Sequence, residues 1–320
     1  MERRTAVRLV CGAALLAGMA GAVAQEKKFP ARPIDMIVNF GPGGGADGLG
    51  RNVAKLMEPV LGVPLPVANV AGASGNAGLA KVLGSTPDGY TIGTMTGLTI
   101  AAWISGLGNM KVSDFAVIAV GQSSPSMLYA PATSSIKSYK QLLEMAKANP
   151  GKIRVATAGY GTLDDVAIKY LATKGVPMTN VPFAKPGERY ASPLGGHSEL
   201  LFEEPGDVVQ FLSSKQYIPL VVFGPKRHPA FPDTPASSEF GHDIDLPNWR
   251  GIVTSAKVPA PLVAVLSEAA AKALQSPGWK AFCAETYSCI DGMTQPQAQA
   301  FVEKNFREVQ QFMRQFGLVK

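Results

Sequence analysis

The chain has 320 residues and a formal net charge of +6, and 46% of its residues are hydrophobic while 17% are charged. At roughly 100–200 residues per domain, this length predicts two domains, each large enough to bury a core. The composition excludes a disulfide-built miniprotein and a disordered tail protein. Basic residues are scattered singly and form no stripe, so we expect no nucleic acid as a partner.

The first 24 residues have the features of an export signal. Three arginines form a charged head, and an apolar run follows at 9–23. Small residues end this run, so we predict cleavage near Ala24 and a mature chain that begins at Gln25. An uncleaved N-terminal anchor is the alternative. No later segment approaches the roughly 18–20 uninterrupted apolar residues that a membrane span needs.

After this signal, segments rich in strand formers alternate with segments of helical periodicity. The predicted strands are 33–40, 65–70, 91–95, 115–120, 153–157, 200–202 and 218–223. The predicted helices are 47–62, capped by Asp47, then 77–83, 138–148, a helix after Thr162, one that starts at 205–207, and two in the tail at 261–274 and 296–316. Such alternation predicts an α/β fold with a parallel sheet, and it places ligand loops at the carboxyl ends of the strands.

Two predicted helices begin at glycine-rich turns, one at 41–45 and the other at 159–161. A glycine-rich turn at a helix N-terminus exposes backbone N–H groups that can hydrogen-bond a carboxylate. Two such loops facing one another across a cleft would hold a dicarboxylate at both ends. The alternative is that the glycines only permit tight turns.

Enzymatic functions compete with this interpretation. The stretch 43–48 satisfies G-x-G-x-x-G between a strand and a helix, as in dinucleotide-binding enzymes. However, Asp47 would place a negative charge beside the pyrophosphate, and the strand at 65–70 ends without an acid for the ribose. The stretch 72–76 misses the G-x-S-x-G nucleophile elbow by its last residue. We therefore expect no cofactor and no catalytic residue.

The remaining titratable groups have plain structural explanations. His228 and His242 are expected at the surface or in turns, and His197 in a structural role, with approach to a cleft as the alternative. The acidic stretch 203–207 matches no metal loop, so helix capping and lining of a cleft are favoured over a metal site or a catalytic carboxylate pair. Cys283 and Cys289, six residues apart, are expected to form a disulfide in an oxidising compartment, with free buried thiols as the alternative.

Taken in order, several motifs resemble the Bug receptors, which are the periplasmic solute-binding proteins of tripartite tricarboxylate transporters. The resemblance rests on 29–34, 40–45 with Asp47 and Arg51, 72–78, 87–91, 194–197, 231–235 and 249–251. It covers nearly all of the mature chain.

The resemblance implies a two-lobed α/β periplasmic binding protein (Venus flytrap) of type II topology with two interlobe crossings. Lobe one would comprise 25–120 and 252–320, and lobe two 121–251. Such a protein is not an enzyme. It would be a periplasmic monomer that captures a small carboxylate, namely a di- or tricarboxylate, an aromatic acid or an acidic amino acid, and delivers it to a two-subunit inner-membrane permease.

Two other functions stay open at this point. One is a secreted α/β hydrolase or dinucleotide-dependent enzyme. The other is a sensor subunit that presents its ligand to the ectodomain of a histidine kinase.

The ligand-binding residues implied by the loops and the resemblance are Phe40, Pro42, Gly43, Gly44, Asp47, Ser74, Asn76, Thr94, Thr96, Gly159, Tyr160, Gly161 and Thr162. The stretch 183–190 departs from the Tyr-x-Gly segment usual in the family. Within it, Lys185 and Arg189 would pair with a distal carboxylate, whereas Glu204 and Asp207 would bind an amino or hydroxyl group. Substituting Asp47 by Lys is expected to disturb the first loop and weaken binding.

Overall fold

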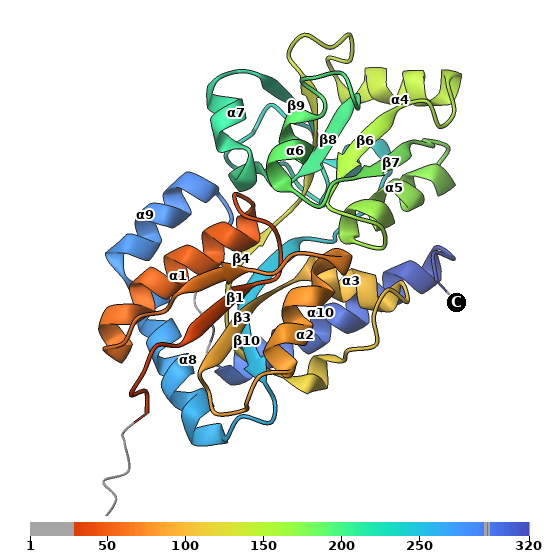
Figure 1. Cartoon of the computed structure of the whole chain (residues 1–320). Helices are drawn as coiled ribbons and strands as arrows, with labels where there is room; N and C mark the ends of the chain where they lie inside the picture. Colours follow the sequence, from red (N-terminus) through yellow and green to blue (C-terminus); the bar gives the residue numbers. More distant parts are fainter. Residues whose placement is uncertain (1–28, 291–292, 294, 320) are drawn as a thin grey trace, which may run out of the picture.

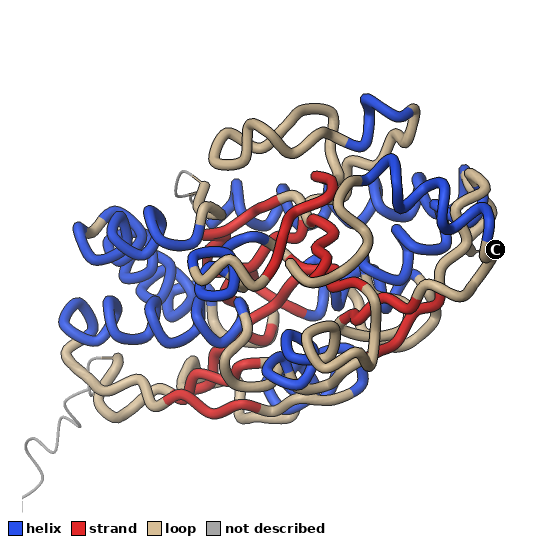
Figure 2. The backbone as a smooth tube through the Cα atoms, turned by 90° about the horizontal axis from the view of Figure 1, so that it is seen from above, coloured by secondary structure: helices blue, strands red, loops and turns tan. Residues whose placement is uncertain are grey.

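The computed structural model describes residues 29–290, 293 and 295–319. These residues form two lobes, each built on a five-stranded sheet (Figure 1). The predicted export signal at 1–24 lies outside the described residues. Helices flank the strands on the outside of the molecule, as the view from above shows (Figure 2). None of the helices in the described ranges is long and apolar enough to cross a membrane.

The first sheet has the strand order β2-β1-β3-β10-β4. Its strands are β1 (Asp35–Val38), β2 (Val67–Asn69), β3 (Thr91–Thr96), β4 (Phe115–Ser124) and β10 (Asn248–Ser255). One face packs against α1 (Gly45–Leu61), α8 (Ala260–Gln275) and α9 (Pro277–Thr286). The other packs against α2 (Asn76–Leu83), α3 (Gly97–Ile104) and α10 (Gln295–Gln315). Both faces of the sheet are therefore buried.

The second sheet has the order β7-β6-β8-β5-β9. Its strands are β5 (Met127–Pro131), β6 (Arg154–Thr157), β7 (Thr179–Pro182), β8 (Leu200–Glu203) and β9 (Tyr217–Val222). Around it lie α4 (Tyr139–Ala148), α5 (Leu163–Thr173), α6 (Pro186–Ala191) and α7 (Val209–Ser213). Short 3₁₀ turns complete the described part of the chain: η1 (Ala73–Gly75), η2 (Val112–Asp114), η3 (Pro205–Asp207) and η4 (Ser237–Phe240).

The prediction of a purely parallel sheet is wrong, because each sheet is mixed. In the first sheet, β1 runs parallel to β2 and β3, but β10 pairs antiparallel with both β3 and β4. In the second, β5 is antiparallel to β8 and β9. The chain leaves the first lobe along β4 and returns along β10, so these two strands run in opposite directions side by side. The alternation of strand and helix segments in the sequence does not reveal the direction in which β10 runs.

The strands β4 and β10 reach the boundary between the lobes. Asn248 at the start of β10 pairs with Ser124 at the end of β4, and β5 of the second sheet begins at Met127. The lobe limits at 120/121 and 251/252 stay a proposal. The ends of these two strands lie a few residues to the lobe-two side of those limits.

The C-terminal helix α10 contacts both lobes. Its first half packs against the first sheet through Ala298 and Val302. Its second half joins the core of the second lobe, where Val309 and Met313 are buried and the Phe316 ring meets the Tyr170 ring edge-on at 4.6 Å. The two lobes therefore share one helix in addition to the crossing strands.

Candidate functional site: the interlobe cleft

Asp47 stabilises the glycine loop between β1 and α1. Its carboxylate accepts hydrogen bonds from the Gly43 amide at 3.0 Å and from Asn69 Nδ2 at 2.9 Å, and it pairs with Arg51 Nε at 2.9 Å. Burial acts to raise the pKa of Asp47, but these partners outweigh burial and lower it below its usual value. The predicted helix cap at Asp47 is wrong, because Gly44 is the N-cap and Asp47 lies in the first turn. The carboxylate shapes the loop and is engaged with the protein.

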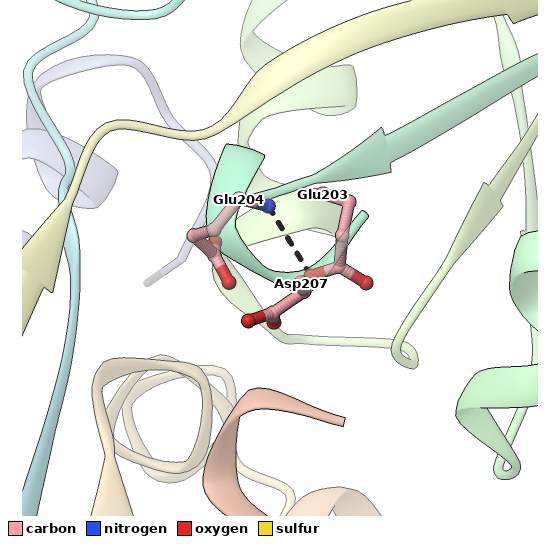
Figure 3. Close-up of side chains that lie close together, drawn as sticks. All are labelled: Glu203, Glu204 and Asp207. Carbon is pink, nitrogen blue, oxygen red and sulfur yellow. Dashed lines mark hydrogen bonds between the residues drawn. The ribbon is translucent and has the colours of Figure 1, made fainter. Parts of the chain in front are cut away.

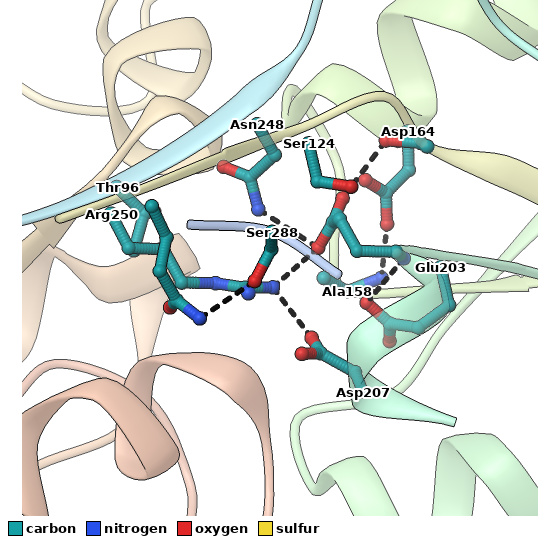
Figure 4. Close-up of polar contacts among 12 residues, drawn as sticks. Thr96, Ser124, Ala158, Asp164, Glu203, Asp207, Asn248, Arg250 and Ser288 are labelled. Atoms are coloured by element: carbon teal, nitrogen blue, oxygen red, sulfur yellow. Dashed lines mark hydrogen bonds and ion pairs between the residues drawn. The ribbon is translucent and has the colours of Figure 1, made fainter. Parts of the chain in front are cut away.

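Arg250, in β10, lies against the start of α1. A Cβ atom added to Gly45 would lie 2.2 Å from the Arg250 Cζ, so only glycine accommodates the guanidinium there. The residue is 3% exposed. Its Nη2 donates at 2.5 Å to both Glu204 Oε2 and Asp207 Oδ2, which come from the second lobe (Figure 4). Arg250 therefore connects the two lobes beside the first glycine loop.

Three carboxyl groups gather on the lobe-two side of this contact. Ligand atoms of Glu203, Glu204 and Asp207 lie within 4.8 Å of one another (Figure 3). Glu204 also accepts from Ser126 Oγ at 2.9 Å and from Asn248 Nδ2 at 3.0 Å. Glu203 is paired with the buried Arg189, whose Nε donates to it at 2.9 Å. Two guanidinium groups thus engage these acids, which makes the cluster an ion-pair network and a poor fit for a metal.

Burial shifts the protonation of these acids. It raises the pKa values of Glu203, Glu204 and Asp207, and the arginines offset the rise only in part. Asp164, at the start of α5, accepts a hydrogen bond from the Ala158 amide at 2.8 Å. Burial, together with the charges of Glu204 and Glu203, raises the pKa of Asp164 to about 8. This carboxyl group is therefore mainly protonated at neutral pH.

A cavity between the lobes is the centre of the site. Its wall is formed by Phe40, Gly44, Gly45, Ala46, Thr96, Leu98, Ala158, Pro186, Arg189, Glu203, Asp207 and Arg250. The cavity volume is about 20 Å³, which is room for one water. Residues of both lobes meet around this small cavity, so the structure represents a closed form.

The predicted residues outside the acid cluster and the second glycine loop fall into three groups. Phe40, Gly44, Thr96, Arg189 and Asp207 line the cavity. Gly43 and Asp47 line, with Asp207, a neighbouring hollow of about 200 Å³.

The third group is engaged elsewhere. Thr94 bonds Asn39, and Asn76 bonds Ala73, Leu107 and Trp103. The Lys185 side chain is 74% exposed and pairs with Glu188, and Pro42 is exposed.

The second glycine loop meets the first lobe beside the cavity. Ser74 Oγ donates to the Tyr160 carbonyl at 3.1 Å, and Ser105 Oγ donates to the Gly161 carbonyl at 3.0 Å. Thr162 Oγ1 bonds the Gly159 carbonyl within the loop. From this segment only the preceding Ala158 belongs to the cavity wall. These residues therefore bridge the closed lobes.

Sequence reasoning missed Arg250, Asp164 and the pairing of Glu203 with Arg189. A signal for Arg250 was present, since it is the one charged residue of the stretch 248–255. A charge in a strand buried at every position requires a partner. Asp164 gave no comparable signal, because acidic residues are common in the first turn of exposed helices.

Cys283 and Cys289 form a disulfide at the end of α9. Among the histidines, His242 is buried and its Nδ1 lies 2.8 Å from the Tyr139 hydroxyl, away from the cleft.

The architecture is that of a two-lobed α/β periplasmic binding protein, as predicted. The solved structure of the periplasmic binding protein BugD superposes with a TM-score of 0.83 at 26% identity, covering 91% of this chain and all of that one. MatC from Rhodopseudomonas palustris, solved with bound malate, has a TM-score of 0.80 at 22% identity over 89% of this chain and 99% of its own.

Residues 49–318 match the family described as the tripartite tricarboxylate transporter family receptor. The UPF0065 protein in the tcbD-tcbE intergenic region of Pseudomonas sp. strain P51 is 29% identical over 276 residues, which are 84% of this chain and 82% of that one. The chain therefore belongs to this family of periplasmic solute-binding receptors, which are not enzymes, and the resemblance to the Bug receptors is confirmed.

Proposed function

We propose that this protein captures a small carboxylate in the interlobe cleft and delivers it to a two-subunit permease of the inner membrane. The observation that carries the proposal is the environment of Arg250. Within the described residues its Nη2 has two acceptors, whereas its Nε and Nη1 hydrogen-bond to none. A buried guanidinium with free donors calls for an anion.

The start of α1 adds donors of its own. The amides of Gly45, Ala46 and Asp47 precede the first possible i→i−4 bond, so they have no intrahelical acceptor. Gly45 and Ala46 line the same cavity as Arg250, and the N-terminal end of a helix favours negative charge. The malate bound to MatC supports the same ligand chemistry. We also propose that the protein is exported, that its signal is cleaved near Ala24, and that it is a monomer in the periplasm.

Thermal-shift measurements test the ligand class. The protein is refolded from denaturant to remove carried-over solute, and then mixed with di- and tricarboxylates, aromatic acids, acidic amino acids and NAD. A ligand at ~100 times its dissociation constant stabilises the folded state by about 2.7 kcal/mol. We expect a shift with one carboxylate class. A shift with NAD alone would overturn the proposal.

A matched pair of glycine substitutions tests the position of the site. In Gly45→Ala the new methyl group displaces the Arg250 guanidinium, so affinity for the stabilising carboxylate is expected to fall at least ~10-fold. In Gly48→Ala, on the same helix, the nearest atom is Phe282 Cζ at 3.8 Å, so binding is expected to stay unchanged. Circular dichroism verifies that both variants fold. Equal affinities in calorimetry would place the site elsewhere.

A further inference from the structure

The charged groups inside the cleft do not balance. Four carboxyl groups, those of Asp164, Glu203, Glu204 and Asp207, are buried there with only two guanidinium groups. Arg189 is used by Glu203, and the single Nη2 of Arg250 is shared by Glu204 and Asp207. With Asp164 protonated, the described part of the cleft retains one negative charge in excess. An uncompensated buried charge is costly.

The hydroxyl groups around the cluster respond to the same negative field. Burial raises the pKa of Tyr129 and of Tyr190, and the carboxylates of Glu203 and Asp207 raise both further. Burial also raises the pKa values of Glu203, Glu204 and Asp207, so a cationic partner would stabilise the ionised forms of these acids.

Two buried amide oxygens beside the cluster also lack donors. Asn248 and Gln122 flank the Arg250 position, since Asn248 is on the same strand and Gln122 pairs with Arg250 across it. Within the described residues, Asn248 Oδ1 and Gln122 Oε1 accept no hydrogen bond, although each residue is 1% exposed. Asn248 Oδ1 lies beside Gly97, whose neighbours Thr96 and Leu98 line the cavity, and Gln122 lines the adjoining hollow with Asp207.

The basic side chains that could bind a second carboxylate of the solute already pair with acids of the protein. Lys185 lies at the surface with Glu188, and Arg189 is committed to Glu203. A dicarboxylate would therefore add two negative charges to a cleft that already has an excess. Acceptors, in contrast, are in surplus, which is the environment that a donor-rich cation requires.

We propose that the solute carries a protonated nitrogen as well as a carboxylate and binds with zero or positive net charge. This inference rests on the proposed function. The carboxylate lies at the start of α1 against the free donors of Arg250, and the nitrogen lies against Glu204 and Asp207. Because Arg250 Nη2 contacts both acids at 2.5 Å, the two subsites adjoin, as the two groups of an amino acid do.

Matched compounds of equal length test this inference on the unmodified, refolded protein by calorimetry. The series are glutarate, 5-aminopentanoate and pentanoate, then succinate, 4-aminobutanoate and butanoate, and finally alanine and lysine against propanoate and hexanoate. We expect the amine-bearing member of the series that binds to be at least ~10-fold tighter than its amine-free partner, as is typical for a hydrogen-bonded charge. Binding is also expected to release protons, measured in buffers of different ionisation enthalpy, because a bound cation lowers the raised pKa values of Glu203, Glu204 and Asp207.

The outcomes separate the two proposals. Tighter binding of the amine-free members, with proton uptake, overturns this inference and leaves the carboxylate receptor standing. Binding of neither kind overturns the proposed function itself. In Glu204→Gln the preference for the amine is expected to fall to about 3-fold or less, since one acceptor charge is gone. The control is Glu188→Gln, which removes an exposed acid outside the cleft and should retain the full preference.

Discussion

At the scale of single residues, the site depends on Arg250. One guanidinium pairs with two acids of the opposite lobe, and in the proposed function its remaining donors bind the solute, which would couple binding to closure. Gly45 makes this placement sterically possible, and the Asp47 carboxylate accepts a hydrogen bond from the Gly43 amide of the loop. Removing the arginine would leave two buried carboxylates without a cation, so Gly45→Ala is the milder way to perturb the site.

Asp164 predicts a pH dependence of stability. Its pKa is raised from 3.8 to about 8, so the folded state holds a proton that the unfolded chain has lost. The contribution of this group to stability is therefore complete below about pH 4 and is lost as pH rises toward about 8, with a slope of about 1 kcal/mol per pH unit.

Asp164→Asn removes this titration and retains an acceptor for the Ala158 amide. The variant is expected to gain melting temperature relative to the parent protein as pH rises from 4 to 8. Glu203, Glu204 and Arg189 face the group in both proteins, so the difference between the two melting curves isolates Asp164. A constant difference across this range would contradict the raised pKa.

At the scale of elements, the segment at the end of α9 contacts both lobes. The disulfide closes the segment 283–289, and Ser288 and Ile290 extend the first sheet by hydrogen bonds of 2.7 and 3.2 Å to β4. The same segment touches the second lobe, where the Tyr287 ring lies 5.7 Å from that of Phe231. The turn η3, which carries Asp207, meets the Thr286 carbonyl through Gly206.

A methyl group at Gly206 would separate these elements. Its Cβ would lie 2.0 Å from the Thr286 carbonyl oxygen, and backbone on both sides cannot yield without moving the lobes apart. Gly206→Ala is therefore expected to weaken solute binding about 10-fold, in line with ordinary overpacking costs. Gly187→Ala, with no atom within 4 Å of the new Cβ, is the control and should bind like the parent. Unchanged affinity in Gly206→Ala would show that this contact does not contribute to closure.

At the scale of the whole molecule, the closed cleft admits about one water, so a solute must enter an open form. We expect opening to separate the charged network and the contacts of the second glycine loop, while the strands β4 and β10 and the helix α10 continue between the lobes. Such closure around a ligand is a hinge motion.

Small-angle X-ray scattering tests the motion. The solute-free protein is expected to have a larger radius of gyration than the closed structure, and a stabilising carboxylate should reduce it to the closed value. Gly206→Ala should remain expanded at the same concentration of solute. A radius of gyration that solute leaves unchanged would mean that binding involves no closure.

Much of the fold was predictable from local patterns. Periodicity and a glycine in the left-handed conformation at Gly62 define α1, and apolar runs predicted β1, β3 and β9. The helix α3 was missed because it is apolar on all sides and shows no helical periodicity, and α9 because it is short and holds a cysteine.

The sequence by itself determined the alternation of strands and helices, the glycine loop at the start of α1 and the family. These depend on residues near one another in the chain. Only the tertiary structure decided that β10 runs antiparallel, that Arg189 belongs to Glu203, and that Arg250 meets Glu204 and Asp207 at the start of α1. The physical reason is that burial and pairing of charges depend on residues from different elements, 14 residues apart for Arg189 and Glu203 and 46 for Glu204 and Arg250, and no local pattern specifies which of them meet.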